Sequence, residues 1–177
     1  MADATRRVFV ALWPDPAVAD ALHALSARAA PCCGGRRMRH DSLHLTLEFI
    51  GDVAESRVPA VLAALAAVRA DAFRLELDTL GHWPHNHLLW AGCRAWPAAL
   101  DRLVVEIRRA LAGLGMAPAT GAAFFPHVTL IRKARPSGPL PEVGAPIAWP
   151  VSAWVLVESC RTADGASYRR LGSGMLG

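Results

Sequence analysis

The sequence predicts one domain of mixed helices and strands, built as two similar lobes. The chain has 177 residues, of which 53% are hydrophobic and 19% charged, enough for one compact domain with a sizeable core. Short apolar runs typical of strands alternate along it with stretches of helical periodicity. Two sequence patterns also recur at one shared offset, nearly half the chain. We therefore expect residues 1–177 to form a single domain of two related halves.

The first half is predicted to contain two strands and two helices. Residues 8–13 form an apolar run rich in β-formers that Pro14 closes. Apolar residues then repeat at helical spacing from Pro16, and we expect Pro31 and the glycines after it to end this helix. Residues 43–50 alternate as a strand that Gly51 stops, and residues 58–68 predict a second amphipathic helix.

The second half is predicted to contain the remaining strands and one helix. Residues 73–80 and 88–92 predict two strands joined by the loop GHWPHNH. A third helix presents apolar side chains along one face between Leu100 and Leu114. The remaining predicted strands lie at 128–131, 149–159 and 168–171.

The repeat joins a histidine motif to a Trp-Pro pair. His44-Leu-Thr-Leu returns 83 residues later as His127-Val-Thr-Leu, and Trp13-Pro14 returns as Trp96-Pro97 at the same offset. In each half the Trp-Pro pair opens a predicted helix that leads to a strand carrying the histidine. A solenoid needs at least three repeats, so two lobes facing each other are favoured.

The doubled motif predicts a site for phosphodiester chemistry. Successive side chains of a strand alternate between its faces, so His44 and Thr46 share one face, as do His127 and Thr129. Related lobes can bring both faces to one cleft. Two imidazoles can divide the work of general base and general acid, while the hydroxyls donate hydrogen bonds to phosphate oxygens. Such a set can act on a cyclic phosphate without a metal ion.

These motifs resemble a known family. HLTLEFIGDV at 44–53 and PHVTLIRK at 126–133 resemble the paired signature of the two-histidine (2H) phosphoesterases. The segments RVFVALWPD, MRHDSLHLTL, LGHWPHNHLLWAG and VLVESCRTADGASYRRL further resemble bacterial RNA 2′,3′-cyclic phosphodiesterases, first named 2′-5′ RNA ligases. The resemblance covers nearly the whole chain.

The resemblance implies a bilobal α+β fold, with antiparallel sheets lining a central cleft and helices outside. It implies hydrolysis of RNA 2′,3′-cyclic phosphate ends to 2′-phosphomonoesters, without a metal or other cofactor. His44 and His127 match the catalytic pair, Thr46 and Thr129 the phosphate ligands, and Arg132 a substrate-contacting arginine. By analogy with the family, His127 is the base that activates water and His44 is the acid that protonates the O3′ leaving group. The symmetry of the two motifs leaves the reverse assignment open.

Other residues are weaker candidates near this site. Arg39 stands just before the first motif and could contact a phosphate, while Phe9 and Tyr168 could stack on a base. Glu48 shares the strand parity of His44 and is expected at the edge of the cleft. A competing metal site would use the histidines and cysteine of one segment, but their spacing fits no common zinc pattern. Its members are His82, His85, His87 and Cys93.

Charge and composition limit the partners. The formal net charge of +4 is compatible with an anionic substrate, here an RNA with a 2′,3′-cyclic phosphate end, such as a tRNA fragment, or a small cyclic nucleotide. No apolar run is long enough to span a membrane, and four cysteines without a pairing pattern favour free thiols in the cytoplasm. We expect a monomer, because two lobes complete one cleft. Reversible 2′-5′ RNA ligation and non-catalytic binding of RNA ends remain alternative functions.

Overall fold

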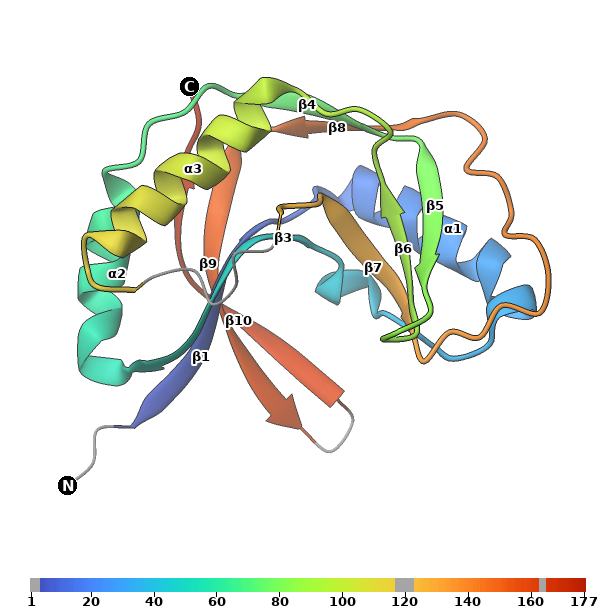
Figure 1. Ribbon diagram of the computed structural model, residues 1–177, viewed down its shortest axis with the longest axis horizontal. Coiled ribbons are helices and arrows are strands. Elements are labelled where there is room, and N and C mark those ends of the chain that lie inside the picture. The colour runs from blue at the N-terminus through green and yellow to red at the C-terminus, as the bar shows by residue number, and fades with distance from the viewer. Residues whose placement is uncertain (1–3, 117–122, 163–164) are drawn as a thin grey trace.

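The computed structural model describes residues 4–116, 123–162 and 165–177 (Figure 1). Strands and helices alternate through the first two thirds of the chain, and strands fill the last third. In chain order the elements are β1 (Thr5–Leu12), α1 (Pro16–Cys33), β2 (Arg36–Arg37), β3 (Leu45–Ala54), α2 (Val58–Ala66), β4 (Phe73–Leu77), β5 (Thr79–Trp83), β6 (Leu88–Gly92), α3 (Ala98–Ala112), β7 (His127–Arg132), β8 (Ile147–Val151), β9 (Ala153–Thr162) and β10 (Gly165–Met175).

One antiparallel sheet carries both halves of the repeat. Its strand order is β10-β9-β1-β3-β7-β6-β5, with β2 also paired to β7, while β4 and β8 form a separate pair. The first half contributes β1 and β3, and the second contributes β6 and β7. Helix α1 packs against β7, whereas α2 and α3 pack against β10 and β3, so each repeat's long helix covers the other half (Figure 1).

The two halves meet where β3 and β7 pair. Leu45 lies opposite Val128 in this antiparallel contact. These two residues are 83 apart and each directly follows the histidine of its motif. An approximate two-fold axis therefore passes between them.

The core explains the helical patterns. Apolar side chains of α1 and α3 face the sheet, and those that are fully buried include Leu22, Leu100, Leu103 and Ile107. A smaller apolar cluster, Phe9, Ala11, Val155 and Val157, lies on the cleft side of β1 and β9, with Trp13 and Tyr168 packed against it. The strand β1 is thus apolar on both faces, as its continuous run predicted.

Several predicted boundaries were wrong. Helix α1 continues through Pro31 to Cys33, because Ala29 and Cys33 are buried in the core, and of the predicted end signals only Gly34, with φ of 56°, ends it. Strand β3 runs past Gly51 to Ala54, and His44 lies just before its first residue.

Two predicted strands are each divided between two sheets. The run 73–80 breaks at Asp78, after which β5 pairs with β6, and the run 149–159 breaks at Ser152. Apolar runs do not reveal where the chain passes from one sheet to another.

Two further expectations concern membranes and cysteines. Among the described residues no helix is both long and apolar enough to cross a membrane. All four cysteines are free; the sulfurs of Cys32 and Cys33 lie 3.5 Å apart at the end of α1.

Candidate active site

His44 is held by a backbone hydrogen bond and by aromatic rings. Its Nδ1 donates to the carbonyl of Ser42 at 2.7 Å, so the hydrogen of a neutral ring sits on Nδ1 and Nε2 keeps its lone pair. Trp13 stacks on the imidazole with ring centres 5.1 Å apart and an interplanar angle of 11°. Phe9 and Tyr168 each place a ring centre 5.0 Å away. The ring therefore has a fixed orientation.

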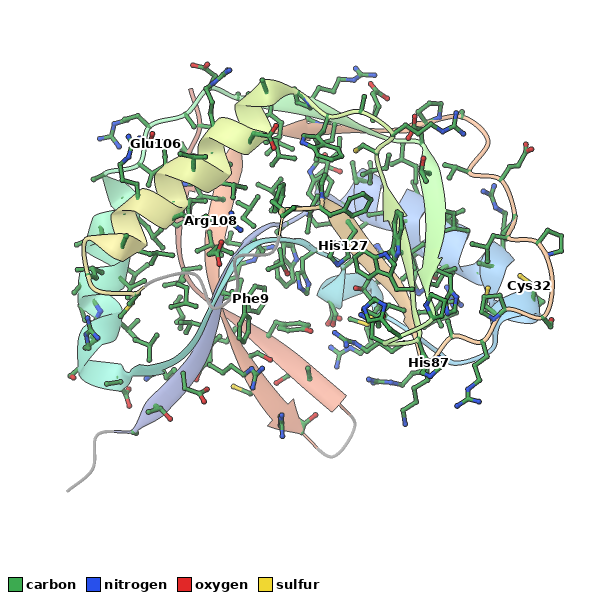
Figure 2. The ribbon with its side chains drawn as sticks, in the orientation of Figure 1. Phe9, Cys32, His87, Glu106, Arg108 and His127 are labelled. Atoms are coloured by element: carbon green, nitrogen blue, oxygen red, sulfur yellow. The ribbon has the colours of Figure 1, made fainter. Side chains whose placement is uncertain are left out.

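His127 is held in the same way. Its Nδ1 donates to the carbonyl of Phe125 at 2.9 Å, again two residues upstream. The ring of Trp83 meets it edge-on, with centres 4.6 Å apart. Both histidines therefore offer Nε2 for chemistry. Figure 2 labels Phe9 on β1 and His127 on β7, the central strands of the two halves.

The strand register brings the two motifs together. Because Leu45 lies opposite Val128, continuing the antiparallel register places His44 beside Thr129 and His127 beside Thr46. The leucine and valine are buried in the core, while the histidines and threonines are half-buried on the opposite face. This register places two imidazoles and two hydroxyls on one face, on either side of the Leu45–Val128 pair.

Burial keeps both imidazoles neutral near pH 7. Desolvation, with smaller effects of Arg132 and His127, lowers the pKa of His44 from 6.5 to about 4. Desolvation also lowers the pKa of His127. In the free protein, therefore, each Nε2 can accept a proton.

An arginine-rich cavity of about 490 Å³ adjoins His44. In the part of the chain that the structure describes, its lining contains four arginines, three aromatic rings and no acidic side chain. The lining residues are Arg7, Phe9, Arg36, His44, Thr46, Phe49, Arg132, Ser159, Arg161, Thr162, Gly165, Ala166 and Tyr168. Such a lining attracts an anion. A larger hollow of about 700 Å³, between α3 and the C-terminal residues, includes neither histidine.

The structure gathers most of the candidate residues here. Phe9, Thr46, Arg132 and Tyr168 line the cavity with His44, and Thr129 and His127 adjoin it through the strand pairing. Arg39 lies apart from them. Its exposed guanidinium pairs with Asp41 and does not line the cavity.

The expectation for Glu48 was wrong. Strand β3 shifts register against β1 at two places, between Val8 and Phe9 and between Val10 and Ala11. Such bulges reverse which side chains face the cleft. Glu48 is buried instead and accepts a hydrogen bond from Arg108 of α3 at 2.5 Å. Figure 2 shows Arg108 below α3. Phe49 takes the place in the cavity that parity assigned to Glu48.

The histidines of the 81–87 segment do not converge. His82 donates to the carbonyl of Ala134 at 3.2 Å, and His85 packs near Trp83. His87 lies in the turn with φ of 55°, and Cys93 is buried. Within the part of the chain that the structure describes, no three His, Cys, Asp or Glu side chains gather into a group that could hold a metal ion.

Among the cavity residues that sequence reasoning missed are three arginines and one aromatic residue, Arg7, Arg36, Arg161 and Phe49. Arg36 belongs to a basic cluster before the first motif, and that cluster was the available signal, although Arg39 was chosen from it. Arg7 shares the strand face of Phe9 on β1, and that alternation was the available signal for it. Phe49 reaches the cavity because of the bulge in β3 between Thr46 and Glu48, and Arg161 comes from the distant hairpin of β9 and β10. No local pattern identifies these two.

Comparison with known proteins identifies the family. Residues 12–90 match a family model described as LigT-like phosphoesterase. An RNA 2′,3′-cyclic phosphodiesterase of Escherichia coli (strain K12) is 31% identical over 137 residues, which cover 77% of this chain and 77% of the relative. The chain belongs to this family of phosphoesterases. The RNA 2′,3′-cyclic phosphodiesterase of Thermus thermophilus is 30% identical over 175 residues, covering 92% and 86% of the two chains.

The structural comparison agrees. The crystal structure of E. coli LigT complexed with 3′-AMP superimposes with a TM-score of 0.89 at 28% identity, covering 97% of this chain and 98% of that one. A Thermus thermophilus crystal structure gives a TM-score of 0.83 at 28% identity, covering 96% and 97%. The α+β fold and the resemblance to 2H phosphoesterases are thereby confirmed, and the protein is an enzyme of the phosphoesterase class.

Proposed function

We propose that this enzyme hydrolyses RNA 2′,3′-cyclic phosphate ends to 2′-phosphomonoesters, using its two histidines and no metal ion. One observation supports this most strongly. His44 and His127 are oriented alike by hydrogen bonds to carbonyls two residues upstream, and each shares its face with a threonine. The arginine-rich cavity beside them suits an anionic substrate. Among the residues that the structure describes no carboxylate lines it, and divalent cations favour carboxylate ligands.

The arrangement supports a balanced two-proton reaction. A water oxygen attacks phosphorus while the Nε2 of one histidine removes its proton. The bond from phosphorus to O3′ breaks, and the protonated Nε2 of the other histidine gives its proton to O3′. Thr46 and Thr129 donate hydrogen bonds to the non-bridging oxygens, and Arg132 offsets the charge that develops there. The 2′-phosphomonoester remains.

We assign the base to His44 and the acid to His127, the reverse of the assignment by analogy. Burial and the nearby Arg132 lower the pKa of His44 to about 4, so its ring stays unprotonated, as a base requires. Burial alone lowers the pKa of His127, and no arginine contributes there. A bound anionic substrate therefore favours the protonated form of His127 over that of His44.

All four reacting side chains come from one chain, so we propose that the monomer is the active unit. The test is product analysis with a short RNA ending in a 2′,3′-cyclic phosphate, in EDTA. We expect a 2′-phosphate product, and a loss of 10²- to 10⁴-fold, roughly, in kcat for His44→Ala and for His127→Ala. His82→Ala, on β5 outside the cavity, is the matched control and should retain activity.

Other outcomes would overturn the proposal. Turnover that requires added zinc or magnesium would contradict the metal-independent mechanism. Binding of RNA ends by the wild-type protein without any turnover would favour a non-catalytic binding module. Joining of two RNA halves in preference to hydrolysis would identify a 2′-5′ ligase.

A further inference from the structure

The arginine-lined cavity extends well beyond the reacting groups. His44, Thr46 and Arg132 lie at one end, and Arg7, Phe49 and Arg161 line it as well. Thr46 pairs with Ala11 of β1 and Phe49 pairs with Phe9, so two residues of β1, roughly 7 Å, separate them along the strands. A single cyclic phosphate and its ribose need only the first end. The far end has room for another part of the substrate.

Phe49 and Arg7 form a layered surface at that far end. The guanidinium carbon of Arg7 lies 4.8 Å from the centre of the Phe49 ring. Phe49 is 37% exposed, whereas most large apolar residues in the described part of the chain are buried. Exposed aromatic rings and guanidinium planes are the surfaces on which unpaired bases stack.

The same end of the cavity is positively charged and partly roofed. The hairpin of β9 and β10 contributes Arg161, and Thr162 donates a hydrogen bond to the carbonyl of Gly165 at 2.7 Å across its turn. Gly165 lies so close to Arg36 that an added Cβ would come within 2.5 Å of the Arg36 Nη1. Arg36 pairs with Arg132 across β2 and β7, so the hairpin spans the cavity from Arg161 to the wall that Arg36 and Arg132 form. Arg7 and Arg161 both line this space, and two guanidinium groups favour a second phosphate there.

We infer that the far end of the cavity binds the nucleotide that precedes the terminal cyclic phosphate. The base of this nucleotide stacks on the Arg7–Phe49 surface, and the phosphodiester that joins it to the terminal ribose lies between Arg7 and Arg161. This inference rests on the proposed function, because it places the cyclic phosphate at His44 and His127. The preferred substrate is then the end of an oligonucleotide, rather than a mononucleoside cyclic phosphate.

The test compares hydrolysis of a mononucleoside 2′,3′-cyclic phosphate and of a dinucleotide ending in the same group. Wild type should have the higher kcat/KM on the dinucleotide. Phe49→Ala should raise KM for the dinucleotide by about 5- to 100-fold, the range for loss of one stacked base, and change KM for the mononucleoside far less. Phe49→Trp should restore the preference. Equal kcat/KM for both substrates in wild type would overturn the inference, as would equal losses in Phe49→Ala.

Charge is tested separately with Arg7→Ala and Arg161→Ala. Each should weaken binding of the dinucleotide and reduce the dependence of log K on log salt by about 0.7 per lost phosphate contact. Arg109→Ala is the matched control, because Arg109 is exposed on α3 and pairs with Glu106. An equal effect of the control would mean that only net charge matters, and would contradict the subsite.

Binding distinguishes failure of the subsite from failure of the proposed function. Fluorescence anisotropy gives the Kd of a dinucleotide 2′-phosphate and of a mononucleoside 2′-phosphate without any turnover. Tighter binding of the dinucleotide that Phe49→Ala abolishes would support the subsite even if neither cyclic phosphate were hydrolysed. Equal affinities would overturn it even if both were.

Discussion

Replacing His44 by glutamine should remove an acid-sensitive part of the folding free energy. Burial, Arg132 and His127 lower the pKa of His44 from 6.5 to about 4 in the folded protein. A proton therefore binds the unfolded chain more tightly, and stability falls as the pH drops from about 6.5 to about 4. The difference of 2.5 pKa units corresponds to about 3 kcal/mol at 1.36 kcal/mol per unit. Below pH 4 the loss is complete.

The assay is urea unfolding followed by tryptophan fluorescence at several pH values. Between pH 7 and pH 4 the stability of wild type should fall by about 3 kcal/mol more than that of His44→Gln, because all other titrations cancel in the difference. Arg132→Ala should make this extra loss smaller, since it removes a nearby positive charge. Parallel stability curves for wild type and His44→Gln would refute the reasoning, as would an NMR titration midpoint near 6.5 for His44.

Three other substitutions test the packing and the chemistry of the site. Glu48→Ala leaves the half-buried Arg108 without its partner and should cost about 2 kcal/mol in urea unfolding, with kcat/KM nearly unchanged because the pair lies outside the cavity. Gly81→Ala would place a Cβ 2.2 Å from the Trp90 ring, so a fall of several degrees in Tm is expected, and an unchanged Tm would contradict the close contact. Thr46→Val removes the hydroxyl that donates a hydrogen bond to the phosphate, and it should lower kcat roughly tenfold on the cyclic phosphate at saturation. A change in KM alone would mean that Thr46 only binds the ground state.

The repeated motif made the strand faces of its histidines and threonines predictable. Strand alternation puts His44 with Thr46 and His127 with Thr129, whatever the rest of the fold does. The common offset of 83 residues, shared by the Trp-Pro pairs, indicated a two-fold relation, and the Leu45–Val128 pair lies on that axis.

Other features could not be predicted, because they depend on contacts between distant segments. The breaks at Asp78 and Ser152 follow from the pairing of β4 with β8, and an apolar run looks the same whether it stays in one sheet or changes sheets. Likewise, α1 passes through Pro31 because its last turn packs on the core.

The sequence by itself determined the paired histidines, their threonines and the symmetry that joins them, because these depend on short-range periodicity and on the repeat. Only the tertiary structure decided what surrounds them. Two bulges in β3 bury Glu48 against Arg108 and turn Phe49 into the cavity, and the β9–β10 hairpin brings Arg161 to the same place. A bulge shifts every later side chain to the other face, and its position is set by the neighbouring strand rather than by the residues within it.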